Sequence, residues 1–150
     1  MSRSPALDAL RDHVDEMVDE IIDKLLRRVD SMAGMPAEFG ADLERISRAL
    51  LGAFFHKLEG GTEVEPIAWG DLTSFELGEI LRALQIGSEV TWRWVKEAFE
   101  KSGCPPEESL AAAESVWESH FQVANSMARE YMRQRQRFVS EFNQLLNRIR

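Results

Sequence analysis

The chain has 150 residues, of which 44% are hydrophobic and 29% are charged. This length fits one domain, and the composition excludes a disordered chain, which would pair low hydrophobicity with high charge. No apolar run approaches the ~20 residues that a membrane span needs, and the N-terminus lacks the apolar stretch of a signal peptide. Cys104 is the only cysteine and cannot form an internal disulfide, so we expect a cytoplasmic protein with no membrane partner.

The net charge of −8 is distributed unevenly along the chain. Residues 129–150 contain six arginines and two acids, whereas the first 128 residues contain 12 basic and 24 acidic residues and carry −12. Because nucleic-acid binding depends on clustered Lys and Arg, we expect no direct nucleic-acid binding by this acidic body. The basic tail is more typical of the solvated face of a helix than of a site for nucleic acid or another anionic partner.

The first predicted helix begins with Ser4 as its N-cap and Pro5 in its first turn. Apolar residues then recur at steps of three and four, which is the pattern of an amphipathic helix. These residues are Leu7, Leu10, Val14, Met17, Val18, Ile21, Leu25 and Val29. Gly34 and Pro36 predict the end of the helix near residues 33–36.

A second helix is predicted over residues 37–58 and is terminated by Gly60 and Gly61. Residues 62–70 contain Pro66 and further acids, so they should form a loop. Within this loop, Ile67 and Trp69 are apolar enough to pack against the body.

The third predicted helix begins at Thr73 or Ser74, because Glu76 follows Thr73 at the spacing of a capping box. It ends at the break formed by residues 102–106, Ser-Gly-Cys-Pro-Pro. Gly87 lies inside this helix, where a glycine costs about 1 kcal/mol relative to alanine. We therefore expect either a bend or the close approach of another helix at Gly87.

The last segment, residues 106–150, contains no glycine and no proline after Pro106, and it predicts one long helix. A seam with alternating steps of four and three follows it, which is the spacing of paired helices. The seam comprises Trp117, Phe121, Ala124, Ala128, Tyr131, Arg135, Phe138, Phe142, Leu145 and Ile149. Arg135 is its polar interruption, of the kind that fixes the register of paired helices.

A helix of this length would span roughly 66 Å, whereas a compact domain of this size has a radius of gyration of only about 15 Å. Residues 129–150 should therefore project from a single domain that comprises residues 1–150. The projecting seam would be exposed in a monomer, so we expect a homodimer. The alternative is that the helix bends near its arginines and packs back on its own body.

No catalytic constellation and no metal-ligand spacing is present, so we predict no enzyme and no catalytic or metal site. His120, beside Trp117 and Phe121, is the one reasonable candidate for a haem ligand. A single histidine on a partly apolar face is more often a core or interface residue, and we expect no cofactor. The aromatic residues could line a small-molecule pocket between helices, although core packing is the default interpretation.

Residues 81–88, Leu-Arg-Ala-Leu-Gln-Ile-Gly-Ser, are followed by Trp92. This run resembles the helical N-terminal domains of RsbR-type stressosome proteins and of PucR-type transcription regulators. The resemblance implies a globin-like or related all-α bundle without haem that dimerises. It also implies that a long C-terminal helix passes a signal to an output domain, and it implies no catalytic residues.

Taken together, these features predict a non-catalytic dimeric sensory or regulatory module. Its output would be a fused domain or a separate regulatory protein partner. The alternative function is a globin-type sensor that binds haem, through His120, or another small ligand.

Overall fold

The computed structural model describes residues 4–61 and 66–149, and in these ranges it contains six helices and no strand. The helices are α1 (Pro5–Asp12), α2 (Val14–Arg28), α3 (Asp30–Ala33), α4 (Ala37–Leu58), α5 (Leu77–Ser102) and α6 (Pro106–Ile149). The predicted all-α class with a long C-terminal helix is confirmed. None of the described helices combines the length and apolar character needed to cross a membrane.

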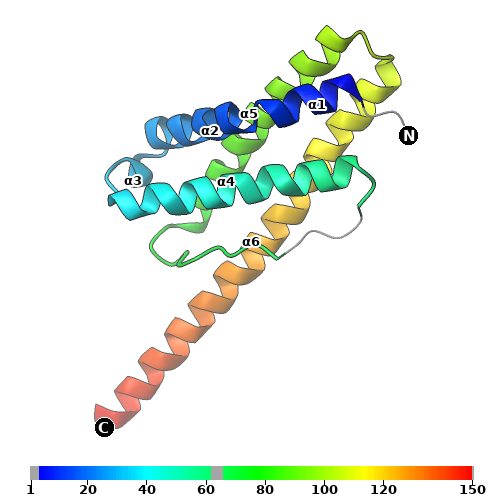
Figure 1. Cartoon of the computed structure of the whole chain (residues 1–150). Coiled ribbons are helices and arrows are strands. Elements are labelled where there is room, and N and C mark those ends of the chain that lie inside the picture. The colour runs from blue at the N-terminus through cyan, green and yellow to red at the C-terminus, as the bar shows by residue number, and fades with distance from the viewer. Residues whose placement is uncertain (1–3, 62–65, 150) are drawn as a thin grey trace.

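The helices form two crossing pairs, and one helix extends well past the rest (Figure 1). The line of α1 and α2 runs beside α4, and the pair of α5 and α6 crosses this layer. Helix α2 packs on both α4 and α5, while α4 also contacts α6. The C-terminal part of α6 leaves this body and projects away from it (Figure 1).

The N-terminal helix is broken into three pieces, so the prediction of one continuous helix is wrong. The first break is at His13, where φ is −109° and ψ is 15°, and the second is at Val29, which has an extended backbone. Val29 is only 3% exposed, and its extended conformation lets the chain turn while its side chain stays in the core. The predicted N-cap position of Ser4 is correct, but its hydroxyl makes no capping hydrogen bond.

Helix α4 has the predicted bounds and ends through the predicted glycines. Gly60 has a φ of 94°, and the backbone amide of Gly61 donates to the carbonyl of His56 at 2.9 Å. This is the Schellman arrangement, in which a glycine takes up the left-handed conformation after the last turn. Of the loop predicted over residues 62–70, residues 62–65 lie outside the described residues. Trp69 is buried and Ile67 is partly buried, as predicted.

The capping box predicted at Thr73 and Glu76 does not form, and α5 begins at Leu77 instead. The backbone amide and the hydroxyl of Thr73 both donate to Asp71 Oδ1, at 2.9 and 2.5 Å. These bonds build a local turn that competes with a helix start. Phe75 is buried in the core within this turn. Burial of Phe75 therefore holds the chain in a non-helical path for a few more residues.

Gly87 lies on the side of α5 that packs against α2, with Leu50 of α4 also nearby, but neither helix comes so close that the position requires glycine. A Cβ atom built on Gly87 would lie 3.8 Å from Ile21 Cγ2 and 4.0 Å from Leu50 Cδ1. Helix α5 continues through this position without interruption. These distances are ordinary contacts, so there is room for a methyl group at Gly87 but little for a longer side chain.

Substitutions at Gly87 should therefore separate by size. We expect Gly87→Ala to raise the free energy of unfolding by up to about 1 kcal/mol, because alanine has the higher helix propensity. Gly87→Leu should lower it by about 1–3 kcal/mol, because its branches meet Ile21 and Leu50. Urea denaturation of both variants measures the difference. A leucine variant with an unchanged midpoint would mean that neighbouring space accepts the side chain.

Candidate functional site

Two adjoining cavities lie between the helices, and both are lined by Ile21, Leu50, Leu84 and Gly87. The smaller cavity reaches toward α6 and the larger one toward the loop before α5. Helices α2, α4 and α5 thus enclose interior space on both sides of Gly87. The small residue at this position helps to keep that space open, because any side chain there would point toward the shared walls.

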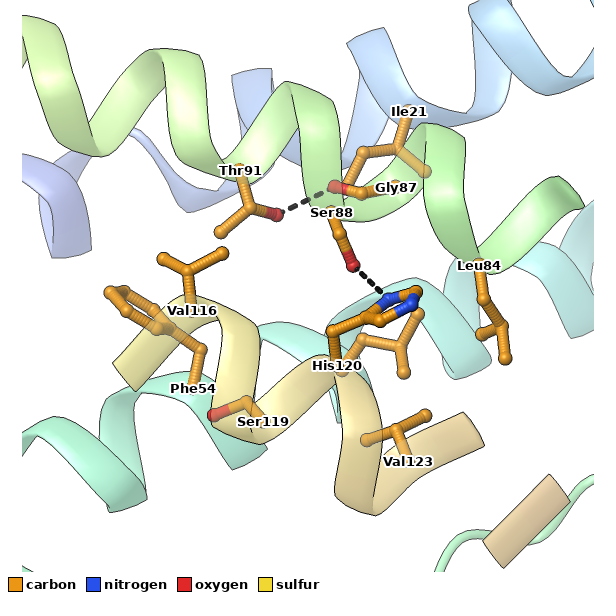
Figure 2. Close-up of a pocket in the computed structure, with 11 residues that line it drawn as sticks. Ile21, Phe54, Leu84, Gly87, Ser88, Thr91, Val116, Ser119, His120 and Val123 are labelled. Atoms are coloured by element: carbon orange, nitrogen blue, oxygen red, sulfur yellow. Dashed lines mark hydrogen bonds between the residues drawn. The ribbon is translucent and has the colours of Figure 1, made fainter. Parts of the chain in front are cut away.

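The smaller cavity, of about 30 Å³, is lined by several polar groups, among them Ser88, Ser119 and His120 (Figure 2). Ser88 Oγ of α5 and His120 Nδ1 of α6 share a hydrogen bond of 2.6 Å across the helix interface. Ser119 is 4% exposed, and its hydroxyl has no hydrogen-bond partner among the described residues. The volume is sufficient for a water molecule, which needs about 10–15 Å³.

The space beside His120 does not fit a haem. An axial histidine must face an apolar pocket large enough for the macrocycle, whereas His120 faces a cavity of about 30 Å³. Its Nδ1 shares the hydrogen bond with Ser88 that joins α6 to α5. His120 therefore acts here as a contact between α5 and α6.

His120 should make folding stability depend on pH. Burial lowers the pKa of its imidazole below the ordinary value of 6.5. The unfolded chain then takes up the proton at a higher pH than the folded chain does. The stabilisation is therefore fully present above pH 6.5 and is lost as the pH falls below that value.

When the pH is lowered from 7.5 to 5.5, the range around the ordinary histidine pKa, the melting temperature of the parent should fall. We expect that of His120→Asn to fall by less. Thermal unfolding followed by circular dichroism at both pH values provides the measurement. His56→Asn, at an exposed position on α4, is the matched control. Equal pH dependence in the parent and the His120 variant would contradict the expectation.

The larger cavity has a volume of about 290 Å³ and lies between α2, the start of α4, α5 and the loop that precedes α5. Its walls are mainly apolar. The loop contributes Trp69, Leu72 and Phe75, which all belong to the buried core. The rings of Phe39 and Phe75 lie 5.4 Å apart at this cavity. Over residues 4–61 and 66–149, the charged and hydroxyl residues of the lining are acids or serines, and none is basic.

The loop that lines the larger cavity is held from two sides. From α4, the guanidinium of Arg45 donates to the carbonyl oxygen of Ala68. From α6, Gln134 accepts a hydrogen bond from the backbone amide of Leu72 and donates one to the carbonyl oxygen of Gly70, both at 2.8 Å. The cavity wall is therefore connected directly to the C-terminal helix.

The predicted seam residues of α6 fall into two groups. Tyr131 is 6% exposed and belongs to the core of its own body, and Ala124 and Ala128 are partly buried. The other seam positions are exposed, namely Trp117, Phe121, Arg135, Phe138, Phe142, Leu145 and Ile149. The seam is thus buried at Tyr131, exposed before it at Trp117 and Phe121, and exposed throughout from Arg135 to Ile149.

Sequence reasoning raised a pocket between helices lined by aromatic residues but did not place it, and it missed the role of Gln134. The cavity is formed by segments far apart in the chain, so no local pattern indicates it. Gln134 is an uncharged residue between Arg133 and Arg135, which is a weak signal. Its two hydrogen bonds depend on the path of the loop at residues 70–72, which the sequence does not define.

Comparison with known proteins gives one match. The family model described as the RsbT co-antagonist protein rsbRD N-terminal domain matches residues 15–145. No curated protein and no solved structure matches the chain. The matched span includes α2 to α5 and nearly all of α6, including the cavities and most of the projecting segment. The chain therefore belongs to the RsbRD N-terminal domain family of stressosome-type regulatory sensory domains.

Proposed function

We propose that the chain is a non-catalytic, cytoplasmic sensory module that forms a homodimer and passes a signal along α6 to an output domain or a separate regulatory partner. The single observation that carries this proposal is the division of α6. Its last buried residue is Tyr131. Beyond that point seven large apolar side chains are at least 40% exposed: Met132, Phe138, Val139, Phe142, Leu145, Leu146 and Ile149.

A second copy of the chain is the occupant that suits this surface best. Phe138, Phe142, Leu145 and Ile149 continue the four-three spacing that keeps one seam of a helix facing a partner helix. Burying each of these side chains is worth roughly 1.5–3 kcal/mol. Exposed apolar patches of this kind mark interaction sites in soluble proteins. Arg135 in the same line would fix the register between the two helices.

The contacts at the root of the projection suggest how a signal would reach it. Gln134 bonds the loop at residues 70–72 and lies one turn beyond Tyr131, where α6 leaves the body. Gln134 also donates to Glu130 Oε1 at 3.1 Å, and this bond lowers the pKa of the Glu130 carboxyl. A change in the loop would therefore act on α6 at the start of its exposed segment.

The test of the dimer is a pair of variants with equal charge. Phe138→Glu with Phe142→Glu adds charge to the exposed seam, and we expect this protein to sediment as a monomer with its helical body folded. Gln136→Glu with Ser140→Glu adds the same charge to the other side of the same helix, and it should sediment as the parent dimer does. Sedimentation velocity measures both, with circular dichroism to confirm folding.

Two results of the sedimentation experiment would contradict the proposal in different ways. A parent protein that is monomeric at all concentrations would overturn the dimer. A seam variant that remains dimeric would place the interface elsewhere and would remove the argument based on α6.

A further inference from the structure

The larger cavity is the strongest remaining feature of the molecule that the proposed dimer does not use. We propose that it binds a compact apolar small molecule without negative charge, and that this ligand is the stimulus of the module. The second half of this statement rests on the proposed sensory function, whereas the binding itself does not.

The volume determines the size of the ligand. The cavity measures about 290 Å³, close to the lower end of the roughly 300–1,000 Å³ that is usual for small-molecule sites. An apolar cavity of about 150 Å³ in another protein is known to bind benzene. A cavity nearly twice as large suits a ligand the size of two fused aromatic rings.

The walls determine the character of the ligand body. Trp69, Phe75 and Phe39 contribute aromatic surface, and Met32 and Met35 contribute flexible side chains that adapt to shape. None of these side chains offers a strong hydrogen-bond partner to the centre of the cavity. The body of the ligand should therefore be apolar and preferably aromatic.

The charges of the lining determine which charged substituents of a ligand the cavity disfavours. Glu38, Asp42 and Asp71 line the cavity and are exposed, and none of the described residues that line it is basic. Arg45 lies nearby, but its guanidinium is held by Asp42 and by the carbonyl oxygen of Ala68. A carboxylate or sulfonate on the ligand would meet these acids without a partner, so an anionic ligand should bind worst.

The position of the cavity connects a ligand to the output helix. Leu72 lines the cavity with its side chain, while its backbone amide donates to Gln134 of α6. Trp69 is likewise a wall residue, and its indole Nε1 donates to Ser126 Oγ of α6 at 3.4 Å. A ligand that displaced either wall residue would act on α6 through these bonds.

Three probes with one ring system test the proposal by isothermal titration calorimetry. They are 1-naphthalenemethanol, 1-naphthylmethylammonium and 1-naphthoate, which are neutral, cationic and anionic. We expect the neutral and cationic probes to bind one site per chain and the anionic probe to bind at least about tenfold more weakly, a difference of about 1.4 kcal/mol. No binding of the neutral probe would overturn the site, and equal binding of 1-naphthoate would overturn its charge selectivity.

Filling the cavity should abolish this binding. Ala83 is a partly buried wall residue on α5, and Ala83→Phe should weaken binding of 1-naphthalenemethanol at least about tenfold. Ile46→Trp, on the opposite wall, is a second filling variant in case the first fails to fold. Ala111→Phe makes the same change at an exposed position on α6 and should bind as the parent does. Unchanged binding by a folded filling variant would overturn the location.

The variant with Phe138→Glu and Phe142→Glu separates this proposal from the dimer. Its exposed apolar seam is disrupted, but neither replaced residue lines the larger cavity, so it should bind the neutral 1-naphthalenemethanol with the affinity of the parent. Loss of binding in this variant would mean that the probe occupies the seam of α6, and it would overturn the cavity as the site. A monomeric parent that still binds the probe would overturn the dimer alone.

Discussion

Phe54→Ala should lower the free energy of unfolding by about 3–5 kcal/mol, the usual cost of truncating a buried aromatic side chain to alanine. Phe54 of α4 is 2% exposed and belongs to a core cluster that also contains residues of α1, α2, α5 and α6. Its ring lies 5.3 Å from that of Phe55, and it also forms one wall of the small cavity beside His120. This loss is a large fraction of the roughly 5–15 kcal/mol by which a folded domain is usually stabilised.

The same variant should respond to a small apolar ligand. Removing the ring joins a new apolar space to the cavity of about 30 Å³, and apolar cavities of roughly 150 Å³ can bind benzene. We expect benzene to raise the urea midpoint of Phe54→Ala by more than it raises that of the parent, in which only the larger cavity of about 290 Å³ can accept it. Leu110→Ala, at a position 63% exposed, is the control. A loss below about 1 kcal/mol in Phe54→Ala would mean that the core closes around the missing ring.

The sequence predicts the helices well where one local signal dominates. Gly60 and Gly61 end α4, the Gly103 break ends α5 with a φ of 67°, and the absence of breakers after Pro106 leaves α6 continuous over 44 residues. Each of these features depends on the backbone preference of one or two residues. The projection of this helix could be predicted as well, because a helix of this length exceeds the size of the body.

Sequence reasoning fails where tertiary contacts override local preference. Val29 continues an apolar helical pattern, yet burial of its side chain requires an extended backbone. Thr73 and Glu76 have the spacing of a capping box, yet Asp71 takes the hydrogen bonds of Thr73. The cavities belong to the same class, because they depend on how α2, α4 and α5 pack around Gly87.

Aromatic residues of α6 should contribute differently to stability before and after the point where the helix leaves the body. Tyr131 and Phe138 are aromatic residues of similar size, seven positions apart on one line of the helix, but their surroundings differ. Tyr131 is 6% exposed in the core that includes Trp69 and Leu72, whereas Phe138 is 64% exposed. Tyr131→Ala should therefore remove about 3 kcal/mol or more from the unfolding free energy of a monomer.

Phe138→Ala should change the unfolding free energy by less than about 0.5 kcal/mol, as exposed substitutions usually do, provided that the protein is dilute enough to be monomeric. At concentrations where the parent dimerises, Phe138→Ala should have the larger effect of the two variants on the dissociation constant of the dimer. Phe138→Ala should weaken the dimer, because each buried aromatic side chain of the seam contributes roughly 1.5–3 kcal/mol. Urea denaturation at low concentration and sedimentation at high concentration separate the two effects. If Phe138→Ala destabilised the monomer as much as Tyr131→Ala does, the end of α6 would have to pack on its own body, and the exposed seam that supports the dimer would not exist.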